Sequence, residues 1–453
     1  MTKLKTIFFV ASALALLGVS ACKDPSDGTG GGSAALPDAP FVEGGASLIL
    51  SPDKLDITVT VTTSDGTSVT VEGCTETELQ SGTQTVLHAQ GTTVKLIGRI
   101  FLLYCRNNRL TALNVQGLTA LRVLDCESNQ LTVLNVQGLK NLRRLDCDNN
   151  RLTALNVQGL TPLQELLCRS NQLTELNVQG LTALRWLDCY GNQLTALNVQ
   201  GLTALQWLYC DSNKLTSLNV QDCTALQRLH CQTNQLAALN VQGFTALQWL
   251  QCYGNQLTAL NVQGLTALQW LYCGGNQLTE LNVQGLTALQ GLGCGSNQLT
   301  ELNVQGLTAL QELYCDSNKL TSLNVQGCTA LQRLHCQTNQ LAALNVQGLT
   351  ALVELSCSGN GLTTLEVQGC VSLQWLWCYS NRLNAEVFIK IFNDLFTHGK
   401  AACWLYTEET GVTEGNHTDF TAPPDLADAF DKAKTVKNWG MCKYDAAGHD
   451  VGI

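Results

Sequence analysis

Residues 205–226 read LQWLYCDSNKLTSLNVQDCTAL, and close variants of this stretch fill most of the chain. Apolar and polar residues alternate twice within it, at residues 208–210 and at residues 218–220. Such alternation is typical of a half-buried strand, and the helical period of about 3.6 residues is absent from the unit. The stretch therefore predicts two short strands on opposite sides of a coil, with turns near Asp211–Asn213 and Gln221–Asp222.

The cysteines repeat at a fixed interval of 21 residues, and an asparagine follows three residues after each. A fixed period in this range is typical of a solenoid, in which each coil contacts only its neighbours. Fourteen of the 21 cysteines in this 453-residue chain belong to the series. They are Cys105, Cys126, Cys147, Cys168, Cys189, Cys210, Cys231, Cys252, Cys273, Cys294, Cys315, Cys336, Cys357 and Cys378.

The pattern L-x-x-L-x-C-x-x-N-x-L resembles the leucine-rich repeat, with cysteine in the third leucine position. The 21-residue length and the second half L-x-x-L-x-V resemble the nested repeats of bacterial surface proteins of the internalin J-like kind. The resemblance covers residues 98–386 and implies a β-rich leucine-rich repeat solenoid of about 14 coils, with two short parallel strands per coil. It also implies that each asparagine side chain hydrogen-bonds the backbone at the turn below the first strand.

We expect the repeated cysteines to be reduced and buried. Neighbouring strands lie about 4.8 Å apart, which suits a disulfide, but their parallel Cβ vectors fit poorly with a dihedral angle of about 90°. No C-x-x-C pair occurs, so a zinc site is unsupported, and we predict neither a metal nor another cofactor. A free thiol packs as a small hydrophobic group. Cys403 and Cys442 lie beyond the repeats, and whether they pair is left open.

Large aromatic residues collect at the outward positions of the first strand. Because these positions alternate with buried Leu and Cys, we expect the rings to point to solvent on the concave side of the solenoid. Exposed Trp and Tyr grouped with Arg are typical of protein interfaces. The alternative is that aromatic residues merely favour strands and stack across them. The predicted partner-binding residues are Trp186, Tyr190, Trp207, Tyr209, Arg228, His230, Trp249, Tyr253, Trp270 and Tyr272.

The outward residues also differ along the chain. Residues 208–247 and 313–352 match except at two positions, an offset of 105 residues that indicates duplication of a five-repeat block. The duplication copied Arg228 and His230 as Arg333 and His335. The earliest coils carry charge on this face instead, at Asp125, Glu127, Arg144, Asp146 and Asp148.

The N-terminus reads as a lipoprotein signal. Two lysines precede an apolar run at residues 7–19, which is too short to span a membrane and typical of a signal peptide ending at residue 21. The sequence VSAC at residues 19–22 resembles the bacterial lipobox, in which the cysteine, here Cys22, is lipidated. Residues 22–40 predict a flexible tether. By analogy, Lys23 weakens retention at an inner membrane, so the resemblance implies a lipid-anchored, surface-exposed protein of the bacterial outer membrane.

Both ends of the solenoid are predicted to be capped, since a bare end exposes a strand edge. Residues 41–97 contain strand-like stretches separated by turns and predict a small β cap. Residues 387–453 predict an α/β cap, with amphipathic helices at residues 384–396 and 426–437.

The formal net charge of −10 gives no electrostatic reason to expect nucleic acid as a partner. We do not expect an enzyme, because the six histidines show neither a metal-binding spacing nor a nucleophile motif. The resemblance implies a cell-surface lipoprotein that binds a protein on a host or neighbouring cell, in adhesion, biofilm formation or host interaction. Because exposed Trp and Tyr also stack on sugars, a carbohydrate-binding module is the alternative, and the residues alone leave both open.

Overall fold

The computed structural model describes residues 39–399 and 401–453. The predicted signal peptide, Cys22 and nearly all of the predicted tether lie outside these residues. Within them the chain forms a leucine-rich repeat solenoid with a 21-residue spacing, as the repeat predicted.

One strand from each coil contributes to a parallel sheet that runs along the solenoid. Strands of successive coils pair in register, so that residues 21 apart lie side by side, as Leu187 and Leu208 do. The central leucine of each strand and the cysteine after it point into a fully buried core. The strands are β7 (Ile100–Tyr104), β9 (Val123–Asp125), β10 (Arg144–Asp146), β11 (Glu165–Leu167), β12 (Trp186–Asp188), β13 (Trp207–Tyr209), β14 (Arg228–His230), β15 (Trp249–Gln251), β16 (Trp270–Tyr272), β17 (Gly291–Gly293), β18 (Glu312–Tyr314), β19 (Arg333–His335), β21 (Glu354–Ser356) and β23 (Trp375–Trp377).

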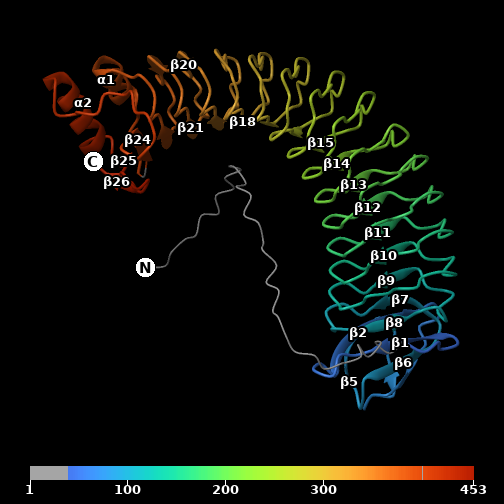
Figure 1. Ribbon diagram of the computed structural model, residues 1–453. Coiled ribbons are helices and arrows are strands. Elements are labelled where there is room, and N and C mark those ends of the chain that lie inside the picture. The colour runs from blue at the N-terminus through green and yellow to red at the C-terminus, as the bar shows by residue number, and fades with distance from the viewer. Residues whose placement is uncertain (1–38, 400) are drawn as a thin grey trace, which may run out of the picture. The chain divides into compact units, whose positions relative to one another are not determined.

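The second strand predicted in each coil forms a backbone ladder in only part of the solenoid. β20 (Ala343–Asn345) pairs with β22 (Thr364–Glu366), and β8 (Ala112–Asn114) pairs with the cap strand β1 (Gly45–Ile49). A few other coils share only isolated bridges, such as that between Asn156 and Asn177. In Figure 1, β18 and β21 lie on the inner side of the curve and β20 lies on its outer side. Coils are farther apart on the outer side of a curve, so backbone hydrogen bonds between them are stretched there.

Side chains of the recurring L-N-V-Q segment replace many of these backbone bonds. The Oδ1 atom of Asn135 accepts from the backbone N–H of Gln137 at 3.0 Å. The Nε2 atom of Gln137 then donates to the carbonyl of Asn156 in the next coil at 2.8 Å, and Gln263 repeats this contact to Asn282 at 2.9 Å. The Asn of the outer side therefore closes a turn within its own coil, and in several coils the Gln bonds the coil to its neighbour.

A ladder of buried asparagines closes the turns on the inner side. The Nδ2 atom of Asn234 donates to the carbonyls of Cys210 and Cys231, both at 3.1 Å. Its Oδ1 atom accepts from the N–H of Leu215 at 2.9 Å. The same bonds recur along the solenoid and satisfy backbone groups that burial would otherwise leave unpaired. The predicted structural role of this asparagine is confirmed.

The fourteen repeated cysteines are fully buried free thiols, as predicted. Burial raises the pKa of the Cys126 thiol well above its ordinary value, and its Sγ donates to the carbonyl of Asp146 at 3.4 Å. Cys403 and Cys442 are also free thiols, the first buried and the second half-buried, so they do not pair with each other.

The N-terminal cap joins the inner sheet directly. β2 (Asp56–Thr63) pairs with β7 of the first coil and, on its other side, with β5 (Gln84–His88). A second sheet packs β1, β3 (Val69–Glu72), β4 (Glu78–Leu79), β6 (Thr93–Ile97) and β8 in the order β4-β3-β6-β1-β8. The first coil is therefore covered, and its edge is not open to another chain.

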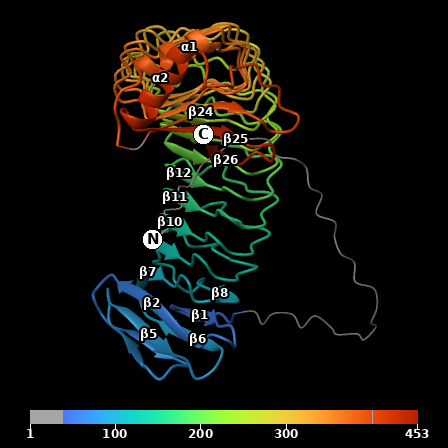
Figure 2. The ribbon, with the colours of Figure 1, turned by 90° about the vertical axis from the view of Figure 1, so that its left-hand side faces the viewer.

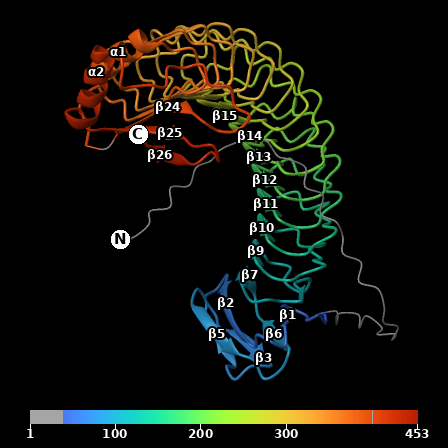
Figure 3. The same ribbon diagram turned by 60° about the vertical axis from the view of Figure 1, so that its left-hand side comes forward.

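The C-terminal cap continues the inner sheet through β24 (Ala401–Thr407), β25 (Trp439–Tyr444) and β26 (Asp450–Gly452). Helices α1 (Ala385–Asp394) and α2 (Pro424–Thr435) lie within two residues of the predicted helices. Figures 2 and 3 show the two helices on one side of the last coil and these strands on the other.

The cap also extends the asparagine ladder without the repeat sequence. The Nδ2 atom of Asn416 donates to the carbonyl of Cys378 at 2.8 Å, and its Oδ1 atom accepts from the N–H of Leu383 at 2.9 Å. The last coil is thereby closed as the others are. In the described part of the chain, neither helix is long and apolar enough to cross a membrane.

Candidate functional site

The outward side chains of the inner sheet form straight rows because the strands are stacked in register. Trp186, Trp207, Arg228 and Trp249 follow one another in a single row, three residues before the ladder cysteines. Adjacent strands lie about 4.8 Å apart, so large side chains in neighbouring coils must touch. Because of this register, outward side chains that recur every 21 residues form one continuous surface.

The structure brings the predicted partner-binding residues together over five coils. The rings of Trp186 and Trp207 meet edge to face at 5.5 Å. Those of Trp249 and Trp270 stack at 5.3 Å, and Tyr209 stacks on the imidazole of His230 at 4.4 Å. The aromatic face, as we name it, comprises Trp186, Tyr190, Trp207, Tyr209, Arg228, His230, Trp249, Tyr253, Trp270 and Tyr272.

The rings lie at the outward positions of the sheet, as expected, but most of them are only partly exposed to solvent. Tyr190 and Tyr253 are 40% and 42% exposed, but the four tryptophans are only half-exposed or less. Trp186 packs against Trp207, and Trp249 packs against Trp270, which is the cross-strand stacking weighed as the alternative. The Nε1 atoms of Trp186 and Trp249 are consequently buried without a hydrogen-bond partner in the described residues. The face is an ordered layer of packed rings.

His230 lies within this layer, between Tyr209 and Trp249. Burial, with a smaller effect of the Arg228 charge, lowers the pKa of His230 to about 4. The Arg228 guanidinium itself lies over the Trp249 ring, 5.7 Å from its centroid, where a cation is attracted to the ring. The imidazole is therefore neutral at ordinary pH, while the thiol of Cys231 is fully buried on the opposite side of the strand. His230 is packed between aromatic rings, and its imidazole and the Cys231 thiol lie on opposite sides of the strand, so the two groups form no dyad.

Two glycines end the aromatic face, and sequence reasoning missed them. A Cβ atom at Gly291 would lie 2.3 Å from Cε3 of Trp270, and one at Gly293 would lie 2.6 Å from Cδ1 of Tyr272. Both rings therefore rest directly on the backbone of the next coil. The available signal was the pair of glycines on either side of Leu292, at positions that carry side chains in the other coils.

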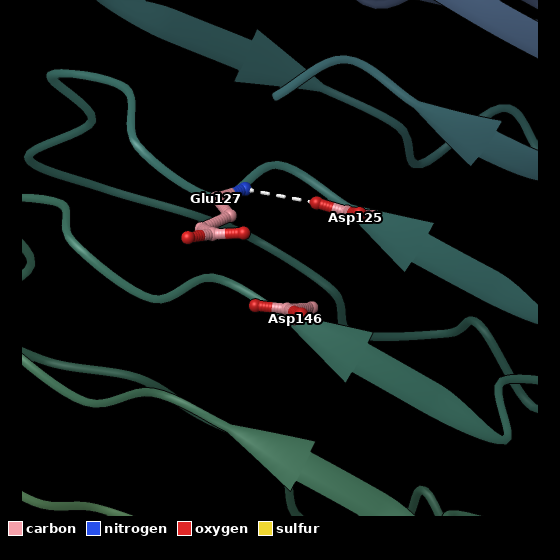
Figure 4. Close-up of side chains that lie close together, drawn as sticks. All are labelled: Asp125, Glu127 and Asp146. Carbon is pink, nitrogen blue, oxygen red and sulfur yellow. Dashed lines mark hydrogen bonds between the residues drawn. The ribbon is translucent and has the colours of Figure 1, made fainter. Parts of the chain in front are cut away.

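A different group of outward side chains lies near the N-terminal end of the inner sheet. Carboxylate oxygens of Asp125, Glu127 and Asp146 lie within 4.8 Å of one another at the ends of β9 and β10 (Figure 4). Such oxygens suit a hard cation, which the sequence had not indicated. Arginines already contribute positive charge here, since Arg144 lies 3.2 Å from Asp146 and Arg106 lies 3.9 Å from Asp125. Ion pairs with these arginines therefore account for the grouping of the carboxylates.

Burial affects these acidic residues strongly. It raises the pKa of both Asp125 and Asp146. Asp148 is almost fully buried, and desolvation raises its pKa to about 8 although Arg169 lies 2.7 Å away. Protonation of Asp148 therefore favours folding of its coil, and this contribution to stability is lost as the pH rises through about 8.

A second aromatic cluster lies at the C-terminal end of the inner sheet. Trp377 stacks on Trp404 with ring centroids 4.7 Å apart, and Trp375 lies 6.1 Å from Trp404. Trp404 Nε1 donates to Asp450 at 2.6 Å. Trp375 and Trp377 follow the repeat pattern, but Trp404 reaches the cluster only because β24 pairs with β23, which no repeat spacing predicts.

Comparisons with solved structures agree with this architecture. The functional domain of InlJ from Listeria monocytogenes, which includes a cysteine ladder, is 28% identical over 80% of this chain and 82% of its own, with a TM-score of 0.59. A leucine-rich repeat protein from Leptospira interrogans is 26% identical over 72% of this chain and 84% of its own, also with a TM-score of 0.59. An internalin, InlF, from Listeria monocytogenes shares the fold at 24% identity, covering 62% of this chain and 88% of its own, with a TM-score of 0.55.

No protein-family model matches the sequence, and no curated protein matches it. The structural neighbours nevertheless confirm an internalin-like leucine-rich repeat solenoid, and they support a protein-interaction scaffold.

Proposed function

From its internalin-like leucine-rich repeat fold, we propose that this chain binds a protein partner through the aromatic face. The observation that carries the proposal is the concentration of Trp, Tyr and Arg side chains on one ordered surface of five coils. These residue types dominate the binding energy of protein interfaces. Their mutual packing also holds them in place before a partner arrives, which lowers the entropy cost of binding.

We further propose that the chain is a lipoprotein of the bacterial outer membrane whose partner lies on a host or neighbouring cell. The lipobox-like sequence before Cys22 and the likeness to internalins support a role in adhesion, biofilm formation or host interaction. Labelling of cells with an alkyne fatty acid should tag the chain and should fail to tag the Cys22→Ala variant. Protease added to intact cells should degrade the chain if it faces outward.

Capture from host and bacterial surface extracts tests the partner-binding surface. The chain should retain a protein that the double variant Trp207→Ala/Trp249→Ala loses at least tenfold. The matched control is Glu312→Ala/Glu354→Ala, which changes the corresponding positions of the duplicated block and should leave capture unchanged. Equal capture by both variants would contradict the assignment to the aromatic face.

A glycan array separates the alternative, carbohydrate binding, from protein binding. Acidic and amide side chains such as Asp188 and Gln251 stand beside the rings and suit sugar hydroxyls. Array binding that the Trp207→Ala/Trp249→Ala variant loses, without any captured protein, would favour a glycan as the ligand.

A further inference from the structure

The row that follows the ladder cysteines holds two polar side chains between two exposed tyrosines. Tyr190, Asp211, Gln232 and Tyr253 occupy this row in four successive coils, and we name them the Tyr-Asp-Gln-Tyr row. The backbone ladder continues past the strands here, since the N–H of Gly191 donates to the carbonyl of Asp211 at 3.1 Å. Whereas the tyrosines are exposed, Asp211 and Gln232 are each only 7% exposed. The hydrogen-bond acceptors of Asp211 and Gln232 thus lie low on the surface, between two projecting tyrosine side chains.

Neither acceptor is used by another side chain. Gln232 Oε1 is buried without a hydrogen-bond partner. The carboxylate of Asp211 is hydrogen-bonded only to its own backbone, and no described Lys or Arg lies within ion-pair distance of it. The arginines nearby are engaged elsewhere, Arg169 with Asp148 and Arg228 with the Trp249 ring. Buried acceptors of this kind are unfavourable unless a donor pairs with them.

The charge of Asp211 affects the ionisation of Tyr253. Burial raises the pKa of Asp211 to about 7. The pKa of Tyr253 is raised by burial first and then by Asp211 and Tyr190, so these three groups lie close enough to interact. A positive charge placed among them would relieve the repulsion and restore the ionised carboxylate.

We propose that the Tyr-Asp-Gln-Tyr row binds the cationic side chain of a lysine or arginine on a partner protein. The ammonium or guanidinium group donates to Asp211 and Gln232, and the rings of Tyr190 and Tyr253 stand on either side of it, where aromatic rings attract a cation. Charge complementarity favours this occupant, because an unpaired carboxylate stands among aromatic rings on a chain of net charge −10. The inference rests on the proposed function, since it assigns the chemistry of one contact made by the aromatic face.

The duplicated block provides an internal control for this site. Asp316 and Gln337 repeat the two acceptors, and Gln337 Oε1 also lacks a partner. Gly295 and Ser358 stand where the first block has its tyrosines. The second block therefore repeats the two acceptor residues without tyrosines beside them, and its Asp316 carboxylate already accepts a hydrogen bond from Ser317 Oγ at 3.3 Å. It should bind cations much more weakly.

Saturation-transfer NMR on the full chain tests the site without knowledge of the partner. The probes are the N-acetyl methylamides of lysine and arginine, with the citrulline derivative as the neutral equivalent of arginine. We expect the cationic probes to bind with a Kd at least fivefold lower than citrulline. The Asp211→Asn and Tyr190→Ala variants should each weaken cation binding at least fivefold, and Asp316→Asn should not weaken it. Tyr190→Phe, which keeps the ring, should bind as the unchanged chain does.

Three results would overturn the proposal: equal binding of citrulline and arginine, equal effects of Asp211→Asn and Asp316→Asn, or tighter binding of spermidine than of the lysine probe, which would indicate a free polyamine as ligand. Circular dichroism checks that each variant is folded, and Asp211→Asn removes a buried charge without changing size. If the Trp207→Ala/Trp249→Ala variant loses its captured protein while the probes fail to bind, the proposed function stands and the cation site falls. If the probes bind while no protein is captured, the cation site stands and the proposed function falls.

Discussion

Residues 227–242 and 332–347 have the same sequence, QRLHCQTNQLAALNVQ, and the same place in their coils, but their surroundings differ. In the first, His230 stacks on Tyr209 and Arg228 lies over Trp249. In the second, Arg333 pairs with Glu312, and His335 Nε2 lies 2.9 Å from Glu354 Oε1. One coil is thus packed among aromatic rings, whereas its copy lies among carboxylates with the Tyr314 ring edge-on to His335.

The difference lies entirely in the neighbouring coils. Trp207 and Trp249 of the first region correspond to Glu312 and Glu354 of the second. Because stacked strands place side chains 21 residues apart in contact, one substitution in a coil changes the environment of two others. Duplication of a solenoid block can therefore keep the scaffold and alter the chemistry, and each prediction below tests one side of this comparison.

The largest expected effect concerns what the two regions share. Asn234→Ala and Asn339→Ala each remove a buried amide with donor bonds to two ladder-cysteine carbonyls and an acceptor bond from a leucine N–H. Leaving such groups unpaired costs about 1–3 kcal/mol each, so each variant should lose about 3 kcal/mol of unfolding free energy. Urea denaturation measures the unfolding free energy of both variants. If one variant lost only half as much unfolding free energy as the other, the two regions would not share a common scaffold.

The next effect should separate the two regions. Trp249→Ala removes a ring stacked on Trp270 and under Arg228 and should cost about 2 kcal/mol. Glu354→Ala removes partly exposed ion pairs with Arg333 and His335 and should cost less than about 1 kcal/mol. The same denaturation series gives both values, and a larger cost for Glu354→Ala would show that the ionic region is the more tightly packed.

Acid should destabilise the packing around His230. The pKa of His230 in the folded chain, about 4, lies below its ordinary value of 6.5. Between these values the unfolded chain binds more protons, so the stability contributed by neutral His230 is lost as the pH falls from 6.5 towards 4. His230→Gln should therefore reduce the loss of stability between pH 7.5 and pH 5 by on the order of 1 kcal/mol.

His335→Gln is the matched control. His335 repeats His230 in the duplicated block but has Glu354 in the place of Trp249, so its replacement should not protect the chain against acid. Thermal melts of both variants at the two pH values provide the measurement. Equal protection by the two substitutions would mean that the rings around His230 do not exclude water as the structure indicates.

The features that sequence could predict are those that depend on the period alone. The 21-residue spacing of cysteine and asparagine determines which side chains point into the core, and strand alternation places Trp186 through Tyr272 on one surface. The packing of those rings depends on contacts between coils, so the burial of His230 and the support of Trp270 by Gly291 were not visible. Trp404 and Asn416 were missed because they join the solenoid through cap pairing, without the repeat sequence.

The smallest predicted effect concerns the boundary between the aromatic and ionic regions. In Gly291→Ala the new methyl group occupies the space of the Trp270 ring, which must swing away from its stack on Trp249. Because a side chain can move where backbone cannot, stability should fall by less than about 1 kcal/mol. The near-ultraviolet circular dichroism of the stacked indoles should nevertheless change clearly.

Gly361→Ala is the control for this boundary, since its Cβ would meet only the carbonyl of Leu341 at 3.6 Å, an ordinary contact. It should leave the aromatic spectrum unchanged. If Gly291→Ala also leaves that spectrum unchanged, Trp270 does not rest on the glycine, and the orientation of the last rings of the aromatic face is set by their stacking alone. If the spectrum changes while the fold persists, the missing side chain at Gly291 is what allows the Trp270 ring to lie on the next coil, and it helps to set where the aromatic region ends.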